Sequence, residues 1–191
     1  MKNTIIYNHQ TTSLSKIDMR MVTAIPSGGN WKNIPLNIPS KRVEGIRRGG
    51  GRTTYYGRLR WDYPAYTIAT YFNRPGNGCN IHPDDASANI PQHRLISFRE
   101  AARIQSFPDN FKFLGTKSSM FKQIGNAAPP LLAYAIAKAL NKSTIIDLFC
   151  GCGGLSKGFE LAGYDVIAGL ELDQHALTTW ARNHSGSPIL G

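Results

Sequence analysis

The sequence predicts an α/β protein, with part of a doubly wound parallel sheet preceded by a smaller, mostly β or irregular lobe. Three observations support this. Apolar pieces broken by Pro and Gly fill residues 18–39. Helical patterns follow at 97–106 and from residue 129. From residue 144 an apolar strand enters a glycine turn, a helix and a second strand. We therefore expect a smaller domain at 1–122, with its orienting helix, and the first strands of the sheet domain at 123–191.

The smaller lobe is expected to hold little helix. In residues 18–39 the spacing of Pro and Gly favours irregular segments and short strands. Residues 41–60 combine seven basic side chains with three consecutive glycines and a pair of tyrosines, a composition typical of a flexible loop. Residues 61–72 are rich in aromatic and β-branched residues and end at a Pro-Gly turn, so they predict a strand.

Two helices are expected next. Ser97 and Glu100 form a capping-box pattern for a helix that ends near Ser106. Pro129-Pro130 opens a second helix, in which apolar residues recur at the spacing of one buried face. We expect that face to contain Leu132, Ala135, Ile136, Ala139 and Leu140.

After the link Asn141-Lys142-Ser143 the pattern changes to a βαβ unit. We expect an apolar strand, a helix over 155–161, a strand over 164–170 and a final helix capped by Asp173. Two parallel strands and two helices cannot cover both faces of a sheet. Because only 37 residues follow Gly154, we expect further polypeptide to supply the rest. The inward residues of the final helix should be Ala176, Leu177, Trp180 and Ala181.

The charge is unevenly distributed. Of the net +10, residues 1–74 carry +9, from 12 Lys and Arg against 3 Asp and Glu. Clustered positive charge binds polyanions by displacing counterions from phosphates, whatever their sequence. We therefore expect a nucleic acid partner, DNA or RNA, although a merely solvated Arg-Gly loop has the same composition. The side chains expected to face the nucleic acid are Lys41, Arg42, Arg47, Arg48, Arg52, Arg58 and Arg60.

The cysteines indicate neither disulfides nor a metal. Their odd number, three, and a start without a long apolar run indicate a reducing, cytoplasmic setting. No run of about 18 apolar residues occurs, so no membrane span is expected. Cys150 and Cys152 share the glycine turn, and Cys79 lies three residues before His82. These spacings suit tetrahedral zinc poorly, so no metal site is expected.

The glycine turn is the strongest chemical signal. Glycines at 151, 153 and 154 allow the backbone to approach a ligand closely, next to the amides that begin a helix. Glu171 ends the next strand, where ribose hydroxyls lie in such folds, so the pattern indicates an adenosine-containing cofactor. Ser156 stands where a dinucleotide motif has its last glycine, which disfavours an oxidoreductase. We expect Asp147 either to anchor the turn, to contact the amino acid end of the cofactor, or to be a structural carboxylate.

Three separated segments resemble signature blocks of the DNA cytosine-5 methyltransferases of restriction-modification systems. They are DLFCGCGGLSKGF with YDVIAGLELD, RLISFREAARIQSFPDNFKF, and QIGNAAPPLLAYAIAKAL. Residues 18–35 and 55–83 also resemble the later part of that family's target-recognition region. The resemblance thus covers nearly all of the chain from Asp18 onward. It implies S-adenosyl-L-methionine as cofactor and double-stranded DNA as substrate.

The resemblance also implies roles for individual residues. The turn would wrap the cofactor, Glu171 would hold its ribose, Leu172 would touch its adenine, and Asn126 with Ala127 would close the pocket. The block from Arg99 to Phe113 would orient the recognition lobe. The implied cofactor residues are Phe149, Cys150, Gly151, Cys152, Gly154, Glu171, Leu172, Asn126 and Ala127.

Two departures from the family pattern shape the expected function. The blocks stand in reversed order, as a circular permutation would leave them, with 141–143 joining the family's last helix to its first strand. No Pro-Cys and no Glu-Asn-Val occur, so the nucleophile that attacks the cytosine is not expected in this chain. We therefore expect one subunit or fragment of a methyltransferase, inactive alone and active in a heterodimer. The alternative is a non-catalytic DNA-binding protein that keeps a remnant of the fold.

Overall fold

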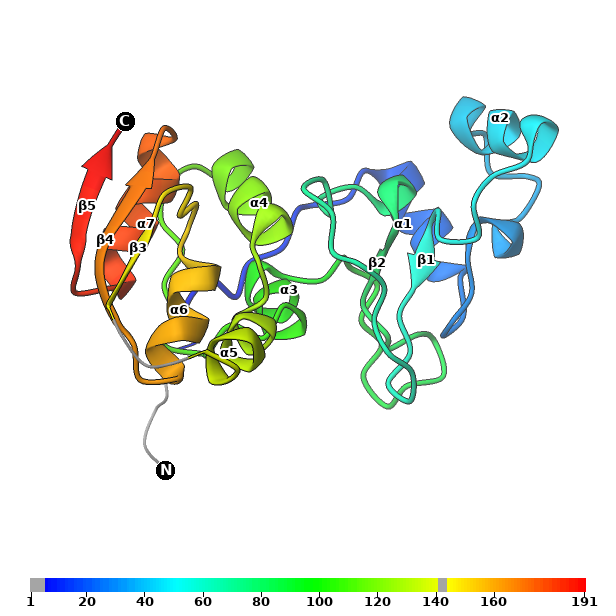
Figure 1. Cartoon of the computed structure of the whole chain (residues 1–191). Helices are drawn as coiled ribbons and strands as arrows, with labels where there is room; N and C mark the ends of the chain where they lie inside the picture. Colours follow the sequence, from blue (N-terminus) through cyan, green and yellow to red (C-terminus); the bar gives the residue numbers. More distant parts are fainter. Residues whose placement is uncertain (1–5, 141–143) are drawn as a thin grey trace. The chain divides into compact units, whose positions relative to one another are not determined.

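The computed structural model describes residues 6–140 and 144–191, which form two compact units (Figure 1). The basic unit is Gln10–Ser97, and the sheet unit joins residues 6–9 to the described part of Phe98–Gly191. The chain thus divides between Ser97 and Phe98, whereas the sequence placed a boundary after residue 122. The expected link Asn141-Lys142-Ser143 lies outside the described residues. No helix in the described ranges is both long and apolar enough to span a membrane.

The sheet unit contains a three-stranded parallel sheet in the order β3-β4-β5. Its strands are β3 (Thr144–Asp147), β4 (Asp165–Glu171) and β5 (Ser187–Leu190). The helices α6 (Gly154–Leu161) and α7 (Gln174–Asn183) connect them. The predicted βαβ unit is confirmed. Sequence analysis missed β5 because a four-residue segment containing Pro188 carries little strand signal.

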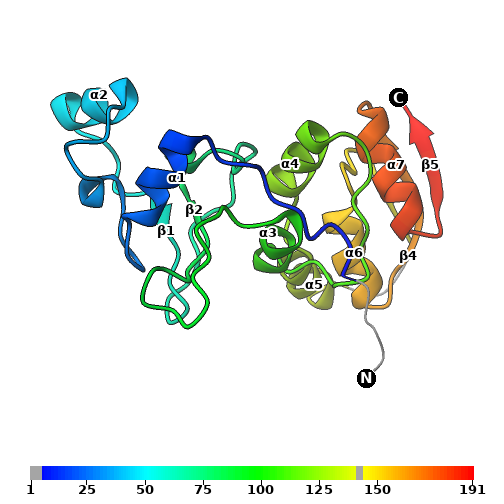
Figure 2. The ribbon, with the colours of Figure 1, turned by 180° about the vertical axis from the view of Figure 1, so that it is seen from behind.

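The helices α6 and α7 pack on the same face of the sheet and contact each other. Figure 2 shows α7 in front of the strands. Val166, Leu177 and Trp180 form a buried cluster that Phe159 of α6 joins. The Asp173 carboxylate caps α7 as predicted, accepting from two backbone amides. The predicted inward position of Ala181 is wrong, since that residue is exposed and Thr179 is buried instead.

The helix α5 (Pro130–Lys138) is confirmed, but its buried face differs from the predicted one. Ala133 and Ala137 are buried, whereas Leu132 and Ile136 are exposed. A Cβ atom on Gly158 of α6 would come within 2.4 Å of the Ala133 Cβ atom. The two helices approach so closely that only small residues fit between them, and the larger apolar side chains point away.

Two further helices complete the sheet unit. The predicted helix near residue 97 is α3 (Phe98–Ile104), and α4 (Lys117–Asn126) was not predicted. The Thr116 hydroxyl caps α4 by accepting from the Ser119 amide at 3.2 Å. Nearby, the fully buried Arg99 guanidinium donates to backbone carbonyls of Tyr7 and Pro108. Arg99 thereby ties α3 to the segments on either side of it.

The basic unit is more helical than the sequence predicted. It contains α1 (Lys16–Thr23), η1 (Trp31–Asn33), α2 (Lys41–Gly49), β1 (Gly57–Arg58), η2 (Pro75–Asn77) and β2 (Cys79–Ile81). The expected absence of helix in 18–39 is wrong, and so is the expected loop across α2. Both helices are short but capped, by the Ser15 and Ser40 hydroxyls.

The strand predicted for 61–72 is not formed, and all of that segment lies in the described part of the chain. Its aromatic side chains lie largely at the surface, since Trp61, Tyr63 and Tyr66 are each more than half exposed. Without a neighbouring strand to pair with, high β propensity does not produce a ladder.

Arg58 is the centre of the basic unit. Its side chain is 1% exposed and donates to backbone carbonyls of five residues. Burial lowers the pKa of the guanidinium, while the nearby Asp85 and Asp84 act against that shift. These hydrogen bonds join segments that are distant in the sequence, through the carbonyls of Val22, Ile25, His82, Asp84 and Gln92.

Replacing Arg58 should therefore destabilise the basic unit. Arg58→Ala leaves several buried carbonyls without a donor, and we expect the free energy of unfolding to fall by about 3 kcal/mol or more. Urea denaturation followed by tryptophan fluorescence measures this. The control is Arg48→Ala, which removes an exposed guanidinium and should change stability by less than about 0.5 kcal/mol. Similar effects of the two substitutions would contradict a central structural function for Arg58.

Candidate functional site

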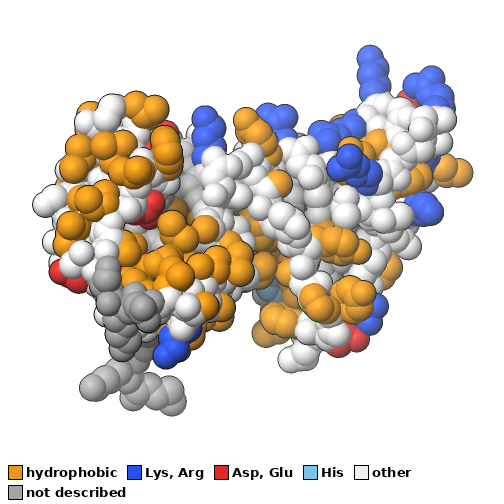
Figure 3. Space-filling view, viewed as in Figure 1, with side chains coloured by type: hydrophobic (Ala, Val, Ile, Leu, Met, Phe, Trp, Pro, Cys, Tyr) orange, Lys and Arg blue, Asp and Glu red, His pale blue; other side chains and the backbone are white. Residues whose placement is uncertain are grey.

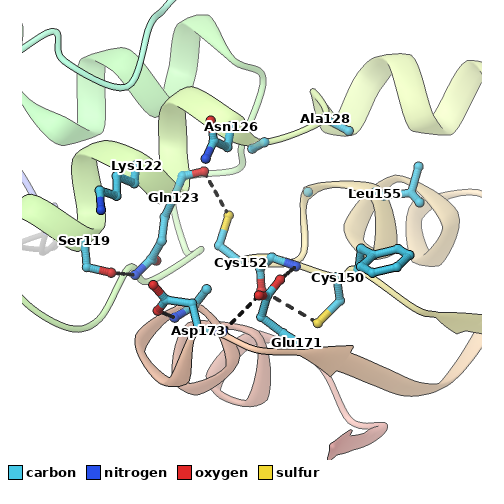
Figure 4. Close-up of a pocket in the computed structure, with 15 residues that line it drawn as sticks. Ser119, Lys122, Gln123, Asn126, Ala128, Cys150, Cys152, Leu155, Glu171 and Asp173 are labelled. Atoms are coloured by element: carbon cyan, nitrogen blue, oxygen red, sulfur yellow. Dashed lines mark hydrogen bonds between the residues drawn. The ribbon is translucent and has the colours of Figure 1, made fainter. Parts of the chain in front are cut away.

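Three distant segments of the sheet unit meet around one pocket of about 360 Å³ (Figure 4). The glycine turn forms one side, and Glu171 at the end of β4 forms the floor with Asp173. The end of α4 lies opposite, where Asn126 and Lys122 project beside the turn. The pocket therefore sits outside the carboxyl ends of β3 and β4, the usual ligand position in open α/β sheets.

Most of the predicted cofactor residues lie together here. The exception is Leu172, which is 74% exposed and does not line the pocket. The lining includes Phe149, Cys150, Gly151, Cys152, Gly154, Glu171, Asn126 and Ala127. The structure thus brings together residues that stand up to 45 positions apart in the sequence, between Asn126 and Glu171.

Backbone amides hold the Glu171 carboxylate at the pocket. Its Oε2 atom accepts from the Gly151 amide at 2.9 Å, and Oε1 accepts from the amides of Leu172 and Asp173 at 2.8 and 2.9 Å. A carboxylate oxygen can accept about two hydrogen bonds, so Oε2, which accepts only one here, retains capacity for a ligand hydroxyl. The same side chain thereby joins the turn to the end of β4.

A buried chain of hydrogen bonds anchors the turn from below. The Ser156 hydroxyl donates to Asp147 Oδ2 at 2.6 Å, and the Trp180 indole donates to the Ser156 hydroxyl at 2.9 Å. Asp147 is 6% exposed and does not line the pocket. Of the functions considered for Asp147, the structure supports anchoring of the turn.

A second pair, of buried His184 and half-buried Glu160, lies under Gly153. His184 Nδ1 is 2.7 Å from Glu160 Oε1, and its ring stacks on Trp180 with centroids 4.9 Å apart. Burial by itself raises the pKa of Glu160, but hydrogen bonds from His184 and Lys157 outweigh it and the net direction is downward. A Cβ atom on Gly153 would lie 2.2 Å from His184 Nε2. The imidazole thus occupies the space that any side chain at 153 would need.

The sequence reasoning missed the contribution of α4. Ser119, Lys122 and Gln123 line the pocket, and Gln123 Nε2 donates to Leu114 O and to the Ser119 hydroxyl. The Cys152 thiol lies 3.4 Å from the Gln123 carbonyl, which links α4 to the turn. The available signal was the capping residue Thr116 followed by apolar residues at helical spacing.

The three cysteines are buried thiols. Burial raises the pKa of Cys152 to about 12 and that of Cys79 to about 11. Burial and the nearby Asp147 and Glu171 charges raise the pKa of Cys150 to about 12. Only a thiolate is an effective nucleophile. Among the described residues, no three His, Cys, Asp or Glu side chains lie together as a metal site would require.

The basic residues of 41–60 do not form one uniform surface. Lys41 and Arg48 are exposed on α2, and Lys and Arg side chains gather over this helix in Figure 3. Arg60 is exposed and paired with Asp62 through two hydrogen bonds. The expected outward position of Arg58 is wrong because its guanidinium is buried among carbonyls. The exposed members are Lys41, Arg42, Arg48, Arg52 and Arg60, with Arg47 half-buried and bonded to Ile34 O.

Exposed aromatic rings accompany these cations. Trp61 is 74% exposed, and Tyr63 stacks under the Arg60 guanidinium at 5.5 Å. Rings and cations on one segment suit contact with bases and phosphates. A second pocket, of about 290 Å³, is lined by Arg60, Tyr63 and Tyr66.

The parallel sheet, the glycine turn and the acid that ends the second strand define an α/β protein with a pocket at the carboxyl ends of its strands. The model of the C-5 cytosine-specific DNA methylases matches this chain over residues 2–142 and again over 143–191. The chain belongs to that family.

Curated relatives agree with this assignment. The chain is 37% identical over 122 residues to type II methyltransferase M.PspPI of Psychrobacter sp., covering 63% of this chain and 27% of that protein. It is 36% identical over 141 residues to type II methylase M.HgiDII of Herpetosiphon aurantiacus, covering 70% and 37%. DNA (cytosine-5)-methyltransferase 3 of Arabidopsis thaliana is 31% identical over 154 residues, covering 73% of this chain and 10% of that protein. The chain spans well under half the length of each.

Substitutions at two glycines of the turn should separate backbone strain from steric conflict. Gly151 and Gly153 both have positive φ, 51° and 100°, but a Cβ atom on Gly151 meets nothing within 4 Å. We expect Gly151→Ala to lower the free energy of unfolding by about 1 to 2 kcal/mol and Gly153→Ala by about 3 kcal/mol or more. Chemical denaturation measures both.

The double variant Gly153→Ala/His184→Ala tests the cause. Removing the imidazole should recover part of the loss at position 153. If the double variant loses as much stability as the two single substitutions together, or more, contact with His184 is not what requires glycine there.

Proposed function

We propose that this chain is part of a DNA (cytosine-5-)-methyltransferase, in which it supplies one wall of the S-adenosyl-L-methionine pocket and part of the DNA-binding surface. The observation that carries the proposal is the meeting of the turn, Glu171 and the end of α4 at one pocket. Family membership and the type II methyltransferase names of relatives support it. The relatives' names further favour a place in restriction-modification.

The pocket suits an adenosine-containing cofactor. Its volume of about 360 Å³ lies within the range of small-molecule sites, roughly 300–1,000 Å³. Glu171 would accept hydrogen bonds from ribose hydroxyls, and the absence of side chains at Gly151 and Gly154, which both line the pocket, leaves room for the cofactor. Asn126 and Ala127 would close the opposite side. The bound cofactor supplies an electrophilic methyl group, and the chain's own residues hold it and exclude water.

The nucleophile would come from the rest of the enzyme. In the family's reaction a cysteine thiolate would attack carbon 6 of a cytosine rotated out of the helix, and carbon 5 would take the methyl group. A base would then remove the carbon 5 proton while the bond from sulfur to carbon 6 breaks and the thiolate leaves. The three thiols of this chain are buried, with raised pKa values. The sequence also lacks the Pro-Cys dipeptide. A complementary polypeptide carrying that cysteine would complete a heterodimer.

The two matched segments support a permuted order. The family model matches this chain in two pieces that adjoin between residues 142 and 143. That junction coincides with the sequence at which the last helix of the family pattern would join its first strand. A circular permutation would place the junction in this way.

The DNA-binding surface would lie on the basic unit. Lys41, Arg48 and Arg52 are exposed, and in the described ranges none of them forms an ion pair. Such side chains can contact phosphates without first breaking an ion pair within the protein. Exposed Trp61 and Tyr66 add stacking surfaces for bases.

Glu171→Gln should weaken binding of S-adenosyl-L-methionine. An amide removes the charged acceptor for the ribose, and we expect affinity to fall about 10- to 100-fold. Isothermal titration calorimetry on the chain with its complementary polypeptide measures this. Asp165→Asn, at the exposed opposite end of β4, is the control and should bind as the unaltered chain does. If both variants bind the cofactor with equal affinity, Glu171 does not contact it.

Methyl transfer should require a second polypeptide. We expect no incorporation of labelled methyl groups into DNA by this chain alone, and activity when it is co-expressed with a neighbouring product that carries a Pro-Cys motif. Activity from the chain alone would overturn the proposed division of the enzyme. Salt-sensitive DNA binding with no calorimetric response to the cofactor would instead favour the non-catalytic DNA-binding alternative.

A further inference from the structure

Among the described residues, no helix covers one face of the sheet, and that face carries exposed apolar side chains. Ile146 is 55% exposed and pairs with Ala168, while Ile189 is 44% exposed and pairs with Leu170. Because Ala168 and Leu170 are two residues apart on β4, these positions share a face. The neighbours Pro188 and Leu190 border α7 on the other face. In Figure 3 hydrophobic side chains gather over the strands on the side turned away from α7.

The direction of the crossovers explains the uncovered face. The chain moves from β3 to β4 and then to β5, always the same way across the sheet. Parallel crossovers are almost always right-handed, so successive steps in one direction place their helices on one face. The contact between Trp180 of α7 and Ser156 of α6 agrees with this. Strands added beyond β5 would add helices to the face that is already covered.

We infer that the complementary methyltransferase polypeptide docks by adding a parallel strand to the free edge of β3 and laying its helices over the face marked by Ile146 and Ile189. This inference rests on the proposed function. Only strands that run outward from β3, opposite to the direction of β4 and β5, place right-handed crossover helices on this face. Parallel sheets are normally covered on both sides, which gives the association its hydrophobic driving force.

The length of the relatives indicates the kind of occupant. The matched part is 27% of M.PspPI and 37% of M.HgiDII, so most of a methyltransferase of that size lies outside it. A second copy of this chain fits less well. It would bring another glycine turn and another basic unit, but no Pro-Cys segment. The new strand would also lie next to Leu148 and Phe149, which are 58% and 87% exposed at the end of β3.

Hydrogen exchange on the mixture of the two polypeptides tests the inference. The probe is the neighbouring gene product with a Pro-Cys motif or, where the reading frame runs on past Gly191, that continuation produced separately. We expect new protection of backbone amides in Thr144–Asp147 and little change in Ser187–Leu190. Protection confined to β5 would overturn the assignment of the edge.

Ile146→Lys tests the face, with Ile90→Lys as a matched control. Ile90 is 69% exposed in the basic unit, so both substitutions replace an exposed isoleucine with a charge. We expect Ile146→Lys to weaken association about tenfold or more and Ile90→Lys to leave it unchanged. Equal binding by both variants would overturn the inference, as would concentration-dependent dimers of this chain alone that Ile146→Lys abolishes.

The proposed function is measured separately on the same mixture. Methyl transfer to DNA together with unaffected binding by Ile146→Lys refutes only the docking surface. Docking through β3 without cofactor binding or methyl transfer refutes the proposed function.

Discussion

Close backbone approach beneath the glycine turn is the constraint on which the sheet unit depends. A Cβ atom on Gly154 would lie 2.2 Å from the Ala128 carbonyl, and one on Gly169 would lie 2.4 Å from the Trp180 indole. Together with Gly158, which faces Ala133, these positions let α5 approach α6 closely and let the Trp180 indole of α7 lie against the backbone of β4. The pocket exists because the segment after α4 can reach the turn at this distance.

Buried hydrogen bonds hold in place the close packing that the glycines permit. Asp147, Ser156 and Trp180 form one buried chain of hydrogen bonds, and Glu160 with His184 forms a second contact between α6 and α7. Buried polar groups are costly unless they are paired, so each bond also restricts the alternatives open to the turn. Glu171 extends this arrangement to the pocket, where three amides hold its carboxylate.

The sequence predicted the βαβ unit and the helices α3 and α5 because their signals are local: strand, glycine turn, caps and helical spacing. It misjudged the buried face of α5, since the requirement for Ala133 comes from Gly158 on another helix. It placed Arg58 at the surface because composition does not distinguish a cation that binds carbonyls from one that faces solvent. It missed α1, α2 and β5, which are short, and whose stability comes from tertiary packing more than from intrinsic propensity.

The buried thiols have a practical consequence. Alkylating reagents attack thiolates, and all three cysteines of this chain are at most 7% exposed with pKa values of about 11 or 12. We therefore expect the folded chain to react only slowly with iodoacetamide near neutral pH. In an assembled enzyme, iodoacetamide would therefore label mainly the cysteines of the other polypeptide. Labelling of the three cysteines of this chain would indicate that the chain has unfolded.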